Sequence, residues 1–181
     1  LNPFSILAGV LSVVALCLHG TTFLAMKTED ALQQRARTLT MGFWIGTLAL
    51  IIAFVVSSFF ARPDFAANYA RYPILIVLPL LVIASLAAIP FFARRKQDGK
   101  AFGASCALII TLLGSAAAGL FPRLLPALAK TGADLTIYNA ASSHHSLVMA
   151  LVMNLIGLSA VVCYTYYVYK VWSGKVQNLG Y

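Results

Sequence analysis

The chain has 181 residues, of which 61% are apolar and only 10% are charged. Soluble domains are about a quarter charged, so this composition excludes an ordinary soluble protein and is typical of an integral membrane protein. The net charge of +8 does not indicate nucleic-acid binding, because the basic residues are divided among several short segments rather than gathered in one.

Five long uncharged stretches follow one another along the chain. Each is long enough for a helix that crosses a bilayer, which needs roughly 20 apolar residues. We therefore expect an all-α integral membrane fold of about five transmembrane helices that form part of a larger helical bundle. Residues 1–181 would be a single membrane domain, with spans at about 4–26, 39–60, 73–92, 101–121 and 147–169.

The first span follows Asn2 and Pro3, and proline suits the start of a helix because no backbone donor is lost there. Leu1 stands where a complete protein has its initiator Met, and a cleavable signal would have a basic start and a shorter apolar core. We therefore expect the polypeptide to continue upstream, so that the chain is the C-terminal part of a longer subunit.

The connector from Lys27 to Arg37 mixes alanine and leucine with charged and amide residues. This pattern is compatible with a short surface helix at the lipid headgroups and equally with a solvated turn. In the second span, Gly42 and Gly46 have the spacing that lets another membrane helix approach closely.

The third span contains Pro79 and Pro90, where kinks are expected. A tight basic turn, 94–100, then joins it to the fourth span, so these two spans should form an antiparallel hairpin. Before the fifth span, Ser142 or Ser143 is placed to cap the helix.

Nine of the thirteen basic residues fall on one side of the membrane if the five spans alternate. Cytoplasmic loops carry an excess of Lys and Arg, so this side should be cytoplasmic. The start of the chain would then lie outside and its C-terminus inside. The nine residues are Lys27, Arg35, Arg37, Arg94, Arg95, Lys96, Lys100, Lys170 and Lys175.

No Asp, Glu, Lys or Arg lies inside an expected span, so the three histidines are the main titratable candidates there. His19 lies deep in the first span, whereas His144 and His145 stand at the outer start of the fifth, so we do not expect a shared metal or haem site. The three cysteines lack metal-ligand or CxxC spacing and are expected to serve packing. They are Cys17, Cys106 and Cys163.

Two interpretations of His19 remain open. Its imidazole would donate a hydrogen bond to a quinone or to a buried polar group of a partner, or it would be satisfied by a neighbouring helix of the same chain.

Four motifs, in this order along the chain, resemble subunit II of cytochrome bd oxidases. They are Leu1–Val10; His19–Thr28 with Arg35-Ala36-Arg37; Leu120-Phe121-Pro122 with Pro126; and Leu135–Ser143 with Ser146-Leu147. The resemblance covers nearly the whole chain and implies the last five of the eight or so helices of that subunit.

The resemblance also implies a function. The chain would belong to a non-haem subunit of a terminal oxidase, supporting quinol oxidation coupled to the reduction of dioxygen to water in a bacterial cytoplasmic membrane. Haem b and haem d would belong to the partner, subunit I. Further expected partners are quinol or quinone, membrane lipid and a small accessory subunit, with no nucleic acid.

No catalytic residue and no metal ligand is assigned to this chain. The candidates for quinone-proximal or structural positions are His19, Gly20, Lys27 and Asn139. The alternative function is half of a membrane transporter, or a scaffold subunit without a redox role, because five spans and a charge asymmetry do not specify chemistry.

Overall fold

The computed structural model describes residues 2–61, 68–125, 127 and 134–174. Five of the helices in this part of the chain are long and apolar enough to cross a membrane. In chain order the elements are α1 (Pro3–Lys27), α2 (Asp30–Ala61), the 3-10 helix η1 (Pro73–Ile76), α4 (Val77–Arg94), α5 (Asp98–Leu120), β1 (Arg123–Leu125), β2 (Leu135–Thr136) and α6 (His144–Val171).

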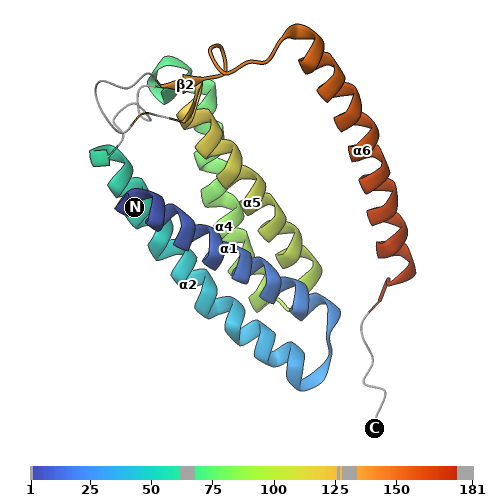
Figure 1. The fold of residues 1–181 in the computed structure, drawn as a ribbon. Helices are drawn as coiled ribbons and strands as arrows, with labels where there is room; N and C mark the ends of the chain where they lie inside the picture. The colour runs from blue at the N-terminus through green and yellow to red at the C-terminus, as the bar shows by residue number, and fades with distance from the viewer. Residues whose placement is uncertain (1, 62–67, 126, 128–133, 175–181) are drawn as a thin grey trace. The chain divides into compact units, whose positions relative to one another are not determined.

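The chain divides into two compact units. Of the described residues, those up to Phe121 belong to the first unit and those from Pro122 to Gly174 belong to the second. In the first unit α1 packs against α2 and α5, and α4 packs against α5 and α2. The four helices therefore form a bundle in which sequence neighbours are also neighbours in space, as Figure 1 shows.

The predicted start of the first span is confirmed by its capping. The side chain of Asn2 accepts a hydrogen bond from the backbone N–H of Phe4, and Pro3 is the first helical residue. After Thr28, Asp30 takes a positive φ of 54° and turns the chain into α2. The turn between the first two helices is therefore only two residues long.

The expected connector from Lys27 to Arg37 is not a separate element. From Asp30 onward it is the first part of α2, so both a surface helix at the headgroups and a solvated turn were wrong. The physical reason is local burial. Ala36 is buried in the first unit, and Gln33 donates a hydrogen bond from Nε2 to the carbonyl oxygen of Ala25 on α1, so tertiary contacts extend the helix beyond its apolar stretch.

The predicted hairpin of the third and fourth spans is confirmed as α4 and α5. Lys96 lies in the turn with a positive φ of 57°, and the backbone N–H of Gln97 donates to the carbonyl of Phe92. Asp98 then opens α5, where a negative charge suits the positive end of the helix dipole.

Pro90, in the interior of α4, leaves a backbone acceptor that a neighbouring helix satisfies. Pro90 lacks an N–H, so it cannot bond to the carbonyl four residues earlier, which is that of Leu86. The indole Nε1 of Trp44 on α2 donates to this carbonyl oxygen at 2.7 Å. A donor from α2 thus satisfies the acceptor that Pro90 leaves unpaired in α4.

The core of the first unit is a small apolar cluster at the centre of the bundle. Its members are fully or almost fully buried: Leu18, Val82, Leu86, Ile89 and Leu108. Many other apolar side chains of the four helices remain exposed, as is typical of surfaces that face lipid or a partner.

The two glycines of α2 differ in their surroundings. A Cβ added at Gly46 would lie 3.4 Å from the side chain of Val14 on α1, whereas one added at Gly42 would meet nothing within 4 Å. The close approach predicted from their spacing therefore occurs at Gly46 only.

The second unit begins with two short antiparallel strands, β1 and β2, in which Arg123 pairs with Thr136. Arg123 Nε also forms an ion pair with Asp134 Oδ2 at 2.7 Å. The strands are an addition to the expected all-helical pattern. Ser143 accepts a hydrogen bond from the backbone N–H of Ser146, which confirms Ser143 as the cap of α6.

We predict that the contribution of the Trp44 hydrogen bond to the stability of the protein depends on Pro90. Trp44→Phe should destabilise the protein by about 1–2 kcal/mol, because the Leu86 carbonyl loses its donor in a nonpolar environment. In a Pro90→Ala background the helix regains an N–H for Leu86, so the same Trp44→Phe change should be less destabilising. Unfolding by SDS titration of the purified protein measures both effects. An equal loss of stability in the two backgrounds would contradict the assignment.

Candidate functional site

A polar cluster joins α1 to α5 inside the first unit. His19 Nδ1 lies 2.8 Å from Ser105 Oγ, and Thr22 Oγ1 lies 2.9 Å from the same oxygen. Ser105 also donates to the carbonyl of Phe102 at 2.7 Å. Ser105 and Thr22 are 1% exposed, so these hydroxyl groups are removed from both lipid and water.

Ser105 has a single hydroxyl proton and two acceptors within reach, the carbonyl of Phe102 and His19 Nδ1. If the proton goes to Phe102, His19 donates from Nδ1 to Ser105 Oγ. If it goes to His19, the imidazole proton lies on Nε2. In both arrangements His19 Nδ1 is bonded to Ser105 inside the chain.

An aromatic ring packs against the histidine. The His19 ring stacks on Phe102 with centroids 4.9 Å apart, and the Phe102 ring in turn contacts Phe23 with centroids 5.6 Å apart. Phe102 comes from α5, and His19 and Phe23 come from α1 one turn apart. The contacts restrict the imidazole to the orientation in which it bonds Ser105.

The other predicted site residues do not gather around His19. Gly20 is half-buried, and a Cβ there would meet nothing within 4 Å. Lys27 is the last residue of α1, about 12 Å farther along the helix axis than His19 at 1.5 Å per residue.

Asn139 belongs to the second unit, where it stabilises the turn after β2. Its side chain accepts from the backbone N–H of Thr136 at 2.6 Å and donates to the carbonyl of Asp134 at 2.8 Å.

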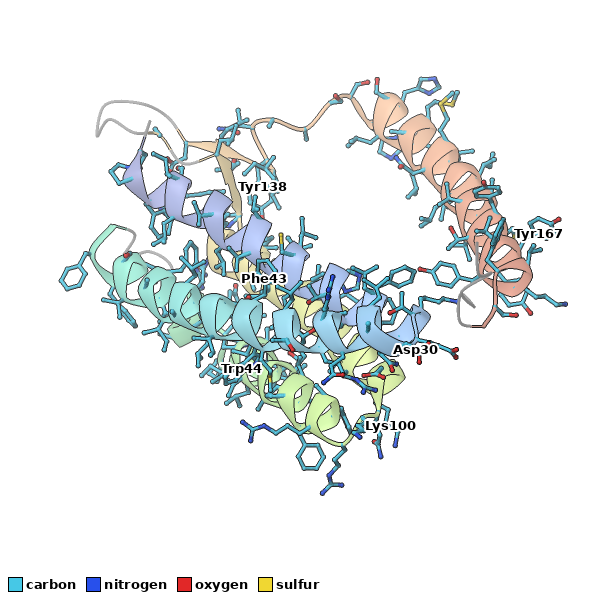
Figure 2. All side chains as sticks on the ribbon, turned by 90° about the horizontal axis from the view of Figure 1, so that it is seen from below. Asp30, Phe43, Trp44, Lys100, Tyr138 and Tyr167 are labelled. Atoms are coloured by element: carbon cyan, nitrogen blue, oxygen red, sulfur yellow. The ribbon has the colours of Figure 1, made fainter. Side chains whose placement is uncertain are left out.

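A second polar cluster lies at the end of the first unit that holds the α1–α2 and α4–α5 turns. Arg37 binds Asp98 with two nitrogens, Nε at 2.9 Å and Nη2 at 2.6 Å, and Gln33 Nε2 donates to the same carboxylate at 3.2 Å. Figure 2 labels Asp30 and Lys100, which mark this end. The pair joins α2 to the start of α5. Sequence reasoning missed it, although a lone acid in a basic turn was a signal.

An apolar cavity of about 550 Å³ opens between helices of the first unit. Its walls include Leu11, Leu48, Phe54, Val82 and Leu112, and exposed side chains such as Phe59 and Ile83 form its rim. The hydroxyl of Tyr69 lies at the wall and donates to the backbone of Ser115 at 2.6 Å. The cavity therefore fits a hydrocarbon chain better than a polar ring.

The described residues contain no group of three or more His, Cys, Asp or Glu that could hold a metal ion. His19 is the one histidine of residues 1–121, so the first unit cannot supply a pair of imidazoles to a haem. The three cysteines are free thiols, and Cys17 and Cys163 are exposed. The packing role expected for Cys17 is therefore not fulfilled among the described residues of the first unit.

Comparison with known proteins finds one family model that matches residues 1–172, that of cytochrome bd terminal oxidase subunit II. The cytochrome bd ubiquinol oxidase subunit 2 of Bacillus subtilis is 31% identical over 94% of this chain and 50% of its own length.

Two other relatives have a lower percentage identity. The probable cytochrome oxidase subunit 2 of Haemophilus influenzae is 26% identical over 98% of this chain and 53% of its own length. The cytochrome bd-I ubiquinol oxidase subunit 2 of Escherichia coli K12 is 25% identical over 98% of this chain and 54% of its own length. The chain spans about half the length of the curated relatives it matches.

The family match covers residues 1–172 and so includes all the helices from α1 to α6. This multi-pass membrane chain therefore belongs to the cytochrome bd terminal oxidase subunit II family.

Proposed function

We propose that this chain is part of the non-haem subunit of a quinol oxidase. In the proposed reaction two quinols are oxidised to two quinones, and the four electrons and four protons reduce one dioxygen to two waters. The observation that carries the proposal is the family match over residues 1–172. The names of the Bacillus subtilis and Escherichia coli relatives, both ubiquinol oxidase subunits, support it.

In this proposal the chain supplies packing rather than electron transfer. The haem-bearing partner, subunit I, holds haem b and haem d and carries the main quinol-oxidising site. The bonding of His19 supports this division, because its Nδ1 is bonded inside the chain to Ser105. His19 and Asn139 are then structural residues, one joining α1 to α5 and the other shaping the turn after β2.

α6 is the surface proposed to meet other parts of the complex or lipid. None of its residues is buried by the described part of the second unit, and the helix is long and apolar enough to cross a membrane. Such a helix requires lipid or protein on every side. The alternative function, half of a transporter or a scaffold without a redox role, gains no support from relatives that are named as oxidase subunits.

The proposal predicts a specific absorption spectrum. The full-length subunit, purified from its own membranes in mild detergent, should bring a larger partner with it. The dithionite-reduced minus oxidised spectrum of that complex should show bands of both b-type and d-type haem. Replacing His19, His144 and His145 together by Gln should leave the haem content per complex unchanged if the complex assembles.

A complex without haem and without a larger partner would contradict the oxidase proposal and favour the transporter or scaffold. Loss of one haem from an assembled triple variant would instead show that this chain supplies a ligand.

We also propose that the protein lies in a bacterial cytoplasmic membrane with the α4–α5 turn on the cytoplasmic side. The basic residues Arg94, Arg95, Lys96 and Lys100 in and beside this turn support the orientation. Lys175, one of the nine basic residues counted on this side, lies outside the described residues, as do Arg62 and Lys130, which the alternation of spans puts on the opposite side.

This orientation can be tested with single cysteines in a full-length subunit otherwise free of reactive cysteine. Gln97 and Ser142 are exposed and lie on opposite sides in the proposed topology. In spheroplasts, a membrane-impermeant maleimide should label the Ser142→Cys variant and should label Gln97→Cys only after lysis. The reverse labelling pattern would contradict the orientation.

A further inference from the structure

A second cavity lies beside the last turns of α4. Its volume is about 410 Å³, and its lining residues are Trp44, Ala87, Pro90, Phe91, Arg94 and Arg95. Four of these side chains are apolar or aromatic, and the two at the end of the helix are arginines. We propose that this cavity binds an anionic phospholipid, with its phosphate between the two arginines and the upper part of an acyl chain along Ala87 and Phe91.

The apolar part of the cavity has no backbone or indole donor left for a polar ligand. Pro90 has no N–H, and the N–H of Trp44 is already donated to the carbonyl of Leu86. The tryptophan ring and the proline ring therefore present carbon surfaces to the cavity. A hydrocarbon chain fits such surfaces, whereas a polar headgroup placed there would lose its hydrogen bonds.

The arginines are available to an anion. The guanidinium carbon of Arg95 lies 4.1 Å from the centre of the Phe91 ring. A guanidinium stacked on an aromatic face keeps its N–H groups free at its edge. Arg94 has no ion pair within the described residues. Asp98, the nearest acid along the chain, is occupied by Arg37 through both of its oxygens, so it does not neutralise the pair.

The depth of the cavity favours a lipid as the source of the anion. Arg94 ends the membrane-spanning segment Pro73–Arg94, so the guanidinium groups lie where a bilayer has its phosphates. Arginine also matches phosphate oxygens with two parallel hydrogen bonds. The carbonyl end of α4 carries a partial negative charge, and the positive charge of the two arginines exceeds it.

The test uses the purified full-length complex, stripped of loosely held lipid and then mixed with equal amounts of phosphatidylglycerol and phosphatidylethanolamine. Native mass spectrometry counts the lipids that stay bound. The unaltered complex should retain phosphatidylglycerol in preference to phosphatidylethanolamine. The double variant Arg94→Gln/Arg95→Gln should retain it about tenfold less, since the phosphate loses the charge-assisted hydrogen bonds of both guanidinium groups.

The matched control is Lys96→Gln/Lys100→Gln. It removes the same charge from the same turn, but neither lysine lines the cavity. It should retain phosphatidylglycerol nearly as the unaltered complex does. Ala87→Phe provides a second variant that keeps both arginines and fills the apolar part of the cavity, and it should also lower retention.

Equal retention by the arginine variant and the lysine control would overturn the proposal, as would equal retention of the two lipids by the unaltered complex. Displacement of the bound lipid by excess inorganic phosphate would overturn it too, because the acyl chain would then add nothing. If the arginine variant does not assemble, the Ala87→Phe result decides, and unchanged retention there contradicts the site.

Discussion

Inside a bilayer the hydrocarbon offers no hydrogen-bond partner, so each polar group must find one within the protein. Two groups in the first unit meet this constraint through another helix. The Leu86 carbonyl, which Pro90 leaves without a donor, receives the indole N–H of Trp44. The His19 imidazole bonds to Ser105. In both cases the partner comes from a different helix, so satisfying the polar group also fixes which helices are neighbours.

These polar contacts help to determine which helices of the bundle lie side by side. Lipid tails are as apolar as leucine, so burial of apolar surface does not by itself drive membrane helices together. The Trp44 contact joins α2 to α4, the His19 contact joins α1 to α5, and the Arg37–Asp98 pair joins α2 to α5. The small apolar core fills the space at the centre of the bundle.

Uncharged stretches and capping residues predicted the helices, because the position of a helix depends mainly on residues that are close together in the sequence. The caps at Asn2 and Ser143 are examples. The contact between His19 and Ser105 joins residues 86 positions apart, and the hydrophobic pattern of the sequence does not reveal such a pair. The extension of α2 to Asp30 was missed for the same reason, since a contact with α1 stabilises it. The sequence marked His19 as a candidate, but only the fold supplied its partner.

The most direct test of this account compares two buried serines in the full-length complex. Ser105 bonds to another helix, whereas Ser85 donates only to carbonyls of its own helix, those of Leu81 and Val82. Ser105→Ala should destabilise the subunit by about 1 kcal/mol more than Ser85→Ala, the size of an interhelical hydrogen bond in membranes. SDS-induced unfolding measures the difference, and the KM for quinol should stay unchanged. Equal stability of the two variants, or a raised KM with no loss of stability, would contradict the account.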